Sequence, residues 1–415
     1  MIERIPDEVC FVRFHGMAAK AATEVMRMKR WFIVLCLILF TVTAADARTK
    51  PKKRVSEAKE EEPPYQAYMV VEAATGKVLE GQQVHLKWPP ASITKLMVAL
   101  LMMEKLTAGE VRLDEKVTIS GNASKMGGSQ VYLKEGEIFT VEDLMKAMLV
   151  ASANDAAYAI AELIAGSEEQ FIHMMNEKAK ALGMSDTTFR SVHGLPPSRN
   201  EDEDITSCYD LALLSRALLK YPKILEWTSI RTDSFRNGMF ILNNHNKLLG
   251  KMPGVDGLKT GYYRKAGYNI VATAERKNLR LVAVVLGSPT AKARDAVAID
   301  RLKADFSLYE MVQVLKKGDL IDQEILLPQG KVPKIKGIAG EAFSYPVPVK
   351  SRNLLTREIQ LPEEMEGEIK ENQKLGEVVI KFQNEEVGRV DIVAPKAVPK
   401  AGSFTIFRRK LGIGS

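Results

Sequence analysis

The order of strand-like and helical segments constrains the fold of this 415-residue chain more than any other feature. Strand-like segments lie near both ends of residues 65–309, and apolar segments of helical length lie between them. The expected strands are Tyr65–Glu72, Gly254–Thr260, Tyr268–Ala274 and Leu281–Leu286, and the expected helices include Ile93–Leu106, Val141–Ile164, Glu168–Leu182, Tyr209–Leu219 and Lys292–Tyr309. This order predicts an α+β domain whose antiparallel sheet is built from both ends of the segment.

The character of the sequence changes near residue 310. Helical periodicity disappears over residues 310–403, and short strand-like runs are separated by proline and glycine. This pattern predicts a small all-β domain. In residues 404–415, Phe404, Phe407 and Leu411 share one helical face beside basic residues. We therefore expect an amphipathic tail that contacts a membrane surface weakly, with a frayed tail as the alternative.

Residues 1–47 have the three parts of a signal peptide. Basic residues at 27–30 precede the apolar run Trp31–Val42, and Ala45-Asp46-Ala47 resembles a cleavage site. The run is shorter than the ~20 apolar residues that span a bilayer. We expect the leader to be removed on export, in preference to an uncleaved anchor. Residues 48–64 then form a charged linker.

Charge and motif content exclude several classes of function. The chain has 59 Lys+Arg and 52 Asp+Glu, and the net charge of +7 is spread along its length. This mild excess suits an acidic substrate or an anionic surface and gives no reason to expect nucleic acid. Histidine spacing typical of zinc peptidases and glycine-rich phosphate loops are absent from the sequence. We therefore expect no metal and no cofactor.

Ser92-Ile93-Thr94-Lys95 supplies a nucleophile and a base at one helix start. Positions i and i+3 share a helical face, so Lys95 can reach the Ser92 hydroxyl. The apolar run that follows should desolvate Lys95 and lower its pKa, as a lysine base requires. Taken alone, the motif is more typical of a capping serine and a solvated lysine than of a catalytic pair.

Two further motifs favour the catalytic interpretation. Lys259-Thr260-Gly261 ends a predicted strand, where the lysine can hold a carboxylate and the glycine allows close approach of a substrate. Ser152-Ala153-Asn154 lies at a helix junction, where a buried polar pair is costly unless it is used. The other Ser-x-Asn sequences begin at Ser120 and Ser198, in apparent surface turns, and at Ser351, in the β domain.

Together, in this order, the three motifs resemble those of penicillin-binding proteins and class A β-lactamases. The more detailed similarity is to the low-molecular-mass penicillin-binding proteins that are serine-type D-alanyl-D-alanine carboxypeptidases, and it covers about residues 65–400. It is carried by Pro90–Lys95, Ser152–Ala157, Val192–Leu195 and Gly254–Gly261. The resemblance implies a β-lactamase/transpeptidase-like catalytic domain followed by a small β domain.

The resemblance also implies roles for individual residues. Ser92 is similar to the acyl-forming nucleophile and Lys95 to its general base. Ser152 matches the proton relay to the leaving amine, and Asn154 matches the residue that holds a substrate amide.

The remaining implied roles concern the substrate. Lys259, Thr260 and Gly261 match the motif that clamps the substrate carboxylate. The backbone N–H of Tyr262 would join that of Ser92 in the oxyanion hole. Arg294 falls where this family places a second cation for the carboxylate, and His193, in Val-His-Gly-Leu, is expected to border the site or to be structural.

One departure concerns Tyr263. Many members of the family have serine or threonine at this position, two residues after the Lys-Thr-Gly glycine. The tyrosine puts the detailed geometry of the carboxylate site, and the preference for peptide or β-lactam, in question.

The resemblance implies a D-alanyl-D-alanine carboxypeptidase that removes the terminal D-Ala from peptidoglycan stem pentapeptides through a Ser92 acyl-enzyme. β-Lactam antibiotics would be covalent inhibitors. The protein would act in the periplasm or at the outer face of the cytoplasmic membrane. Two alternatives remain: a D,D-endopeptidase that cleaves peptidoglycan cross-links, and a non-catalytic protein that senses penicillin or binds the cell wall.

Overall fold

The computed structural model describes residues 63–196 and 202–411. The expected leader, nearly all of the expected linker and the Ser198-Arg199-Asn200 sequence lie outside the described residues. Within the described ranges, no helix is long and apolar enough to cross a membrane.

A five-stranded antiparallel sheet organises the first domain. Its strand order is β2-β1-β9-β8-β7, so the first and last strands in sequence are neighbours, as predicted. The bounds are β1 Ala67–Glu72, β2 Val78–Gln82, β7 Val255–Tyr263, β8 Gly267–Arg276 and β9 Leu279–Ser288. Strand β7 lies at one edge, and no strand of the described residues pairs with its outer side, although Thr228 and Asn246 donate to the carbonyls of Asp256 and Gly257 at its start.

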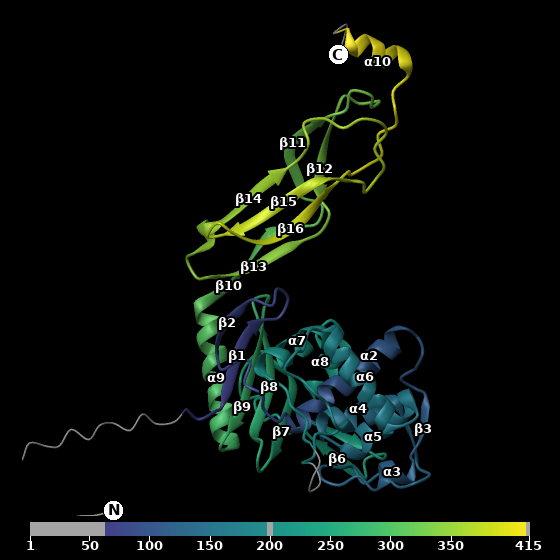
Figure 1. The fold of residues 1–415 in the computed structure, drawn as a ribbon, viewed down its shortest axis with the longest axis vertical. Coiled ribbons are helices and arrows are strands. Elements are labelled where there is room, and N and C mark those ends of the chain that lie inside the picture. The colour runs from purple at the N-terminus through teal and green to yellow at the C-terminus, as the bar shows by residue number, and fades with distance from the viewer. Residues whose placement is uncertain (1–62, 197–201, 412–415) are drawn as a thin grey trace, which may run out of the picture. The chain divides into compact units, whose positions relative to one another are not determined.

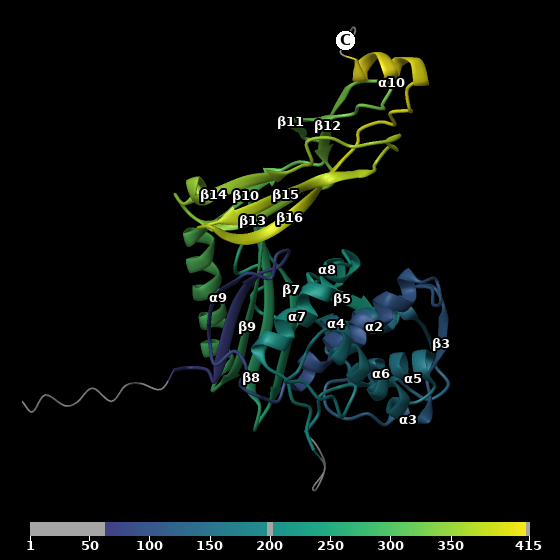
Figure 2. The same cartoon turned by 45° about the horizontal axis from the view of Figure 1, so that its top comes forward.

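Alternate residues of the central strands pack into two different cores. In β9, Val282, Val284 and Leu286 belong to the core shared with the helical block. Leu281, Ala283 and Val285 belong to the core shared with α9 (Ala291–Leu308). Figures 1 and 2 show α9 on one face of the sheet and the helical block on the other. Both faces are therefore covered, which explains why the strands are apolar throughout.

The helical block lies between β2 and β7 in sequence. It contains η1 Ala91–Thr94, α2 Lys95–Thr107, α3 Gly121–Ser124, α4 Val141–Val150, α5 Asn154–Ala165, α6 Glu168–Ala181, α7 Cys208–Leu218 and α8 Lys223–Thr228. Two small hairpins are formed by β3 Lys116–Thr118 with β4 Ile138–Thr140, and by β5 Thr232–Phe235 with β6 Phe240–Asn243. Helix α2 is buried from Lys95 to Met103, so it is the central helix of the block.

Residues from Tyr309 onward form a second group of strands. The strands are β10 Tyr309–Leu315, β11 Leu320–Leu326, β12 Lys334–Ala339, β13 Phe343–Pro348, β14 Leu355–Gln360, β15 Lys374–Phe382 and β16 Glu385–Val393. They form a sheet of order β11-β12-β16-β15-β14 and a β10–β13 pair. A short helix, α10 Ser403–Lys410, follows. The predicted α+β fold class with a following all-β part is confirmed.

Several elements differ from the sequence-based expectation. The helix expected to begin at Ser92 begins as the 3-10 turn η1 and becomes α-helical only at Lys95. Within the expected helical segment Val141–Ile164, the helix is interrupted after Val150, at the junction that was expected around Ser152. The elements that sequence analysis did not identify include α3, α8, the β5–β6 hairpin, β10 and β12.

Candidate active site

Ser92 and Lys95 face each other at the start of the central helix. Lys95 Nζ lies 3.0 Å from Ser92 Oγ and donates to the carbonyl oxygen of His193 over 2.7 Å. The lysine is fully buried. Burial, and secondarily the positive charge of Lys259, hold the Lys95 pKa well below its usual value. A neutral amine in this position can take the proton from the serine hydroxyl.

Ser152 occupies the interruption between α4 and α5. Its φ of +63° is in the left-handed region, which turns the chain sharply before Asn154 begins α5. Lys259 Nζ donates to Ser152 Oγ over 2.9 Å and to the Thr260 carbonyl over 3.1 Å. This contact joins the second and third sequence motifs, which are about 100 residues apart in the chain.

Within the described part of the chain, the side-chain amide of Asn154 has a hydrogen-bond partner at its nitrogen and none at its oxygen. Its Nδ2 donates to the carbonyl of Gly127 over 2.7 Å. Its Oδ1 is buried and has no hydrogen-bond partner among the described residues. A buried amide oxygen without a donor is costly, so this atom is suited to accept an N–H group from a bound molecule.

The glycine of the third motif allows β7 to approach η1. A Cβ atom on Gly261 would lie 2.3 Å from the Pro90 carbonyl oxygen and 3.2 Å from the Ser92 nitrogen. Any side chain would therefore push the edge strand away from the nucleophile. The side chain of Tyr262 points elsewhere, because its ring stacks on Tyr268 with centroids 4.1 Å apart.

Lys259, Thr260 and Arg294 are all buried close to the nucleophile's helix. Burial and the charge of Arg294 lower the Lys259 pKa to about 7. Arg294 lies in the first turn of α9 and donates to Asp295 through Nε and an Nη atom, over 3.0 and 2.6 Å. The charge of Arg294 acts on Lys259, and the charge of Lys259 acts on Lys95, which is kept neutral. The positive charges of Lys259 and Arg294 therefore favour an anion at the site.

His193 borders the site through its backbone. Its carbonyl oxygen accepts from Lys95, while ring Nδ1 accepts the N–H of Leu195 over 3.0 Å. Ring Nε2 lies 3.7 Å from a Glu168 carboxylate oxygen. Burial and the charge of Lys95 lower the His193 pKa to about 4, so the ring is neutral near pH 7. The sequence pattern identified the residue but gave no indication that the carbonyl would make the contact.

The segment before α7 is fixed next to η1 by one carboxylate. Asp204 is buried and accepts from the Thr94 hydroxyl over 2.8 Å. The same carboxylate accepts from the backbone N–H of Arg190 and from the N–H and hydroxyl of Ser191. Sequence analysis did not single out Asp204, because these partners are distant in the chain.

Two more side chains near the site were not identified as functional. His245 lies between Asn244 and Asn246. The Asn244 amide donates to the Ile230 carbonyl, and the Asn246 amide donates to the Gly257 carbonyl. Partial burial and the charge of Lys259 lower the His245 pKa to about 4. Glu203 accepts the Tyr263 hydroxyl over 2.7 Å. The sequence signal for His245 was the pair of asparagines around it, and Glu203 had no such signal.

The other Ser-x-Asn sequences are placed differently. Ser120 caps α3, where it accepts from the Ala123 N–H and donates to Glu162. Ser351 precedes a short 3-10 turn in the β-rich part of the chain. In the described ranges, no group of three or more His, Cys, Asp or Glu side chains could hold a metal ion.

Two family models match this chain. The model described as D-alanyl-D-alanine carboxypeptidase matches residues 54–290, and the model described as the C-terminal domain of penicillin-binding protein 5 matches residues 309–400. The D-alanyl-D-alanine carboxypeptidase DacF of Bacillus subtilis is 35% identical over 92% of this chain and 97% of its own length. DacC of Escherichia coli is 32% identical over 81% of this chain and 85% of its own.

Solved structures show the same similarity. Penicillin-binding protein 5 from Haemophilus influenzae matches with a TM-score of 0.70 and 26% identity, over 81% of this chain and 98% of that one. PBP3 from Streptococcus pneumoniae, a peptidoglycan synthesis regulatory factor, matches with a TM-score of 0.71 and 28% identity, over 81% and 99%.

Proposed function

This chain belongs to the D-alanyl-D-alanine carboxypeptidase family, and from that premise we propose that Ser92 is its nucleophile and Lys95 its general base. The chain is a serine-type D-alanyl-D-alanine carboxypeptidase and a penicillin-binding protein. The observation that carries the proposal is the fully buried Lys95 amine 3.0 Å from Ser92 Oγ, with its pKa well below the usual value.

Acylation begins when neutral Lys95 takes the Ser92 hydroxyl proton. The oxygen attacks the carbonyl carbon of the penultimate D-Ala, and the resulting oxyanion accepts from the backbone N–H groups of Ser92 and Tyr262. The C–N bond then breaks. The Ser152 hydroxyl passes its proton to the leaving amine and takes back the proton held by Lys95, so free D-Ala departs and Lys95 is neutral again. Water then attacks the ester and gives a proton to Lys95, which returns it to Ser92 Oγ as the ester C–O bond breaks and the shortened peptide is released.

Two sets of contacts orient the peptide. Lys259, Thr260 and Arg294 bind the carboxylate of the terminal D-Ala, for which charge-assisted hydrogen bonds are well suited. The unpaired Asn154 Oδ1 accepts an N–H of the acyl part of the substrate. The free edge of β7 pairs with the extended peptide backbone.

The proposal is tested by labelling the protein with a fluorescent penicillin and by measuring D-Ala release from a stem pentapeptide. Cleavage of cross-linked peptide dimers, measured in parallel, separates a carboxypeptidase from an endopeptidase. Faster cleavage of dimers than of the pentapeptide would assign the endopeptidase activity. Labelling without any hydrolysis would assign the non-catalytic sensing role.

The place of action is also a proposal. The leader pattern in residues 1–47 supports export to the periplasm, or to the outer face of the cytoplasmic membrane. In α10, Phe404 and Phe407 are exposed, as is Leu411 immediately after it, and this supports contact with a membrane surface. Arg409 donates to the carbonyls of Gly330 and Lys331, so Arg408 and Lys410 are the tail cations left for lipid headgroups.

A further inference from the structure

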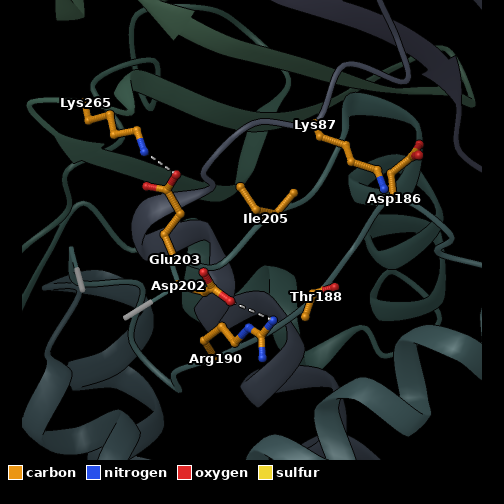
Figure 3. A pocket seen from close by; sticks show the side chains of 8 residues that line it. All are labelled: Lys87, Asp186, Thr188, Arg190, Asp202, Glu203, Ile205 and Lys265. Carbon is orange, nitrogen blue, oxygen red and sulfur yellow. Dashed lines mark hydrogen bonds and ion pairs between the residues drawn. The ribbon is translucent and has the colours of Figure 1, made fainter. Parts of the chain in front are cut away.

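A charged cavity lies beside the last residues of β7. Its volume is about 420 Å³, and it is lined by the segment that leads into α7 and by Lys265, just after β7. Figure 3 shows acidic and basic side chains around it, with Ile205 between them. Nothing in the proposed reaction so far uses these residues.

The proposed reaction determines which part of the substrate reaches this cavity. The terminal carboxylate binds at Lys259 and Arg294, and the reacting carbonyl lies between Ser92 and Tyr262. The acyl part of the peptide must therefore extend away from Lys259. Along β7 that direction leads past Tyr263 toward Lys265, which lines the cavity. The residue that precedes D-Ala-D-Ala is thus directed at this cavity.

Glu203 is the charged side chain of the cavity that is most firmly oriented. It is 15% exposed, and its carboxylate accepts the Tyr263 hydroxyl over 2.7 Å and the Lys265 ammonium over 2.6 Å. Burial and the nearby carboxylate raise the Tyr263 pKa, so the phenol keeps its proton and remains a donor. Tyr263 therefore fixes one oxygen of Glu203 and leaves the other for a cation.

Lys265 is an exchangeable partner for Glu203. Its side chain is 73% exposed. Ion pairs with a solvent-exposed lysine contribute little stability, so another ammonium group can replace Lys265 at small cost. Asp202 faces the same cavity but is 82% exposed and paired with Arg190 at 3.3 Å. Asp186 also lines the cavity and is as buried as Glu203, but it is paired with His85 at 2.8 Å and lies away from Lys265. Glu203 is therefore the less exposed carboxylate beside the end of β7.

We propose that Glu203 is a specificity-determining residue that binds the side-chain amine of the residue preceding D-Ala-D-Ala. The ammonium group takes the place of Lys265, its methylene groups lie against Ile205, and Tyr263 keeps the carboxylate in position. This inference rests on the proposed function and assigns to Glu203 the recognition of the third residue's side chain. It also gives a role to Tyr263, whose hydroxyl holds the Glu203 carboxylate.

Two tripeptides that differ by one charge test the proposal. We compare kcat/KM for D-Ala release from Nα-acetyl-L-Lys-D-Ala-D-Ala and from its Nα,Nε-diacetyl form at low salt. The full-length enzyme should prefer the free amine by roughly tenfold, as expected for one charge-assisted hydrogen bond at a partly exposed site. The preference should fall as salt is added. A peptide with glutamate as its third residue should be the poorest of the three.

Variants assign the preference to Glu203. In Glu203→Gln the ratio between the two lysine peptides should fall to about one, and a general loss of activity cancels in that ratio. In Lys265→Ala the ratio should increase, because the competing cation is gone. The matched control is Glu110→Gln, which removes a surface carboxylate paired with Lys105, and its ratio should equal that of the unaltered enzyme.

Three results would overturn the inference alone: equal hydrolysis of both lysine peptides, an unchanged ratio in Glu203→Gln, or a preference for the glutamate peptide. The last would make the cavity's cations the specificity groups. Absence of D-Ala release from every peptide would instead overturn the proposed function, and this inference with it.

Discussion

Lys95 and Lys259 are both fully buried, yet the proposed chemistry requires opposite charge states of them. A base must be neutral, and a carboxylate clamp must be charged. The protein meets the first requirement by burial and by placing Lys259 nearby. The second is met only in part before substrate binds, since the Lys259 pKa is about 7. An incoming carboxylate should raise that pKa and bring Lys259 to its charged form.

The pH dependence of kcat/KM should reveal this arrangement. Because kcat/KM reports on the free enzyme, it should decrease as pH rises through about 7 and Lys259 loses its proton. Lys259→Arg should move this alkaline decrease upward by more than one pH unit, since arginine stays charged. Initial rates from pH 5 to 10 provide the measurement. An identical alkaline limb in the variant would assign the limb to another group.

The same shift affects stability. The unfolded chain holds the Lys259 proton up to about pH 10.4, whereas the folded protein loses it near 7. The unfolded state therefore binds more protons between these values, and the contribution of Lys259 to the free energy of unfolding rises with pH across that window. Thermal melts of the unaltered protein and of Lys259→Met, measured on both sides of pH 8, should converge in the alkaline range.

Ser92→Ala should abolish both penicillin labelling and D-Ala release. The Ser92 hydroxyl contacts Lys95 and caps no helix, so its loss should change the free energy of unfolding by only about 1 kcal/mol. Ser120→Ala is the control for loss of a serine hydroxyl outside the site, because Ser120 caps α3. Labelling is followed on a gel and folding by a thermal melt. Continued labelling of Ser92→Ala would show that another serine is the nucleophile.

At the scale of secondary-structure elements, the break between α4 and α5 builds one wall of the site. Asp155 is fully buried just after the break, and its carboxylate accepts the N–H groups of Val131 and Leu133 over 3.1 and 3.0 Å. Asn154, which directly precedes Asp155, contacts the same segment, because its backbone N–H donates to the Ser129 carbonyl. Residues 129–133 are therefore held by residues of the break itself.

Asp155→Ala should open this wall. It removes the acceptor of three buried N–H groups, those of Val131, Leu133 and Ala156, and should lower the free energy of unfolding by about 3–5 kcal/mol. It should also reduce kcat/KM, since Asn154 moves with the loop. Asp143→Ala is the control: it removes the capping box of α4 and should cost only about 1 kcal/mol, with activity retained. Chemical denaturation and D-Ala release measure both. Full activity in a destabilised Asp155→Ala would separate the wall from catalysis.

The elements that sequence analysis identified are those with a strong apolar period. Strands β8 and β9 and helices α2, α7 and α9 were predicted to within a few residues. The β5–β6 hairpin was missed although Asn237-Gly238 is a hairpin signal, and Arg236 and Asn237 both have positive φ. Strand β10 begins directly where α9 ends, so no turn residue marks the change.

Strand β12 was missed for a different reason. Lys334 and Lys336 make it polar at alternate positions, and Gly337 weakens the strand signal. The glycine is required by packing, because a Cβ there would lie 2.2 Å from Ile392 Cγ2. Side-chain contacts between distant segments could not be predicted from the sequence either. The motifs indicated Ser92, Lys95, Ser152 and Lys259, but no sequence pattern connected Glu203 with Tyr263, 60 residues away.

At the scale of the whole molecule, the end of the chain combines exposed apolar and basic groups. Phe404, Phe407 and Leu411 are 73%, 59% and 55% exposed. Helix α10 spans only Ser403–Lys410, so the apolar area it can bury in a bilayer is small. Each cation near an anionic surface adds about 1 kcal/mol. Binding should therefore be weak and should depend on both contributions.

Liposome flotation of the protein from residue 48 onward, with and without residues 404–415, should show lipid-bound protein only when the tail is present. Arg408→Gln with Lys410→Gln should weaken binding to anionic vesicles, and 0.5 M salt should do the same. Phe404→Ser with Phe407→Ser should weaken binding at every salt concentration. Arg409→Gln is the control, because Arg409 already donates to two carbonyls and is not free for headgroups. Equal flotation with and without the tail would rule out the tail as the membrane contact.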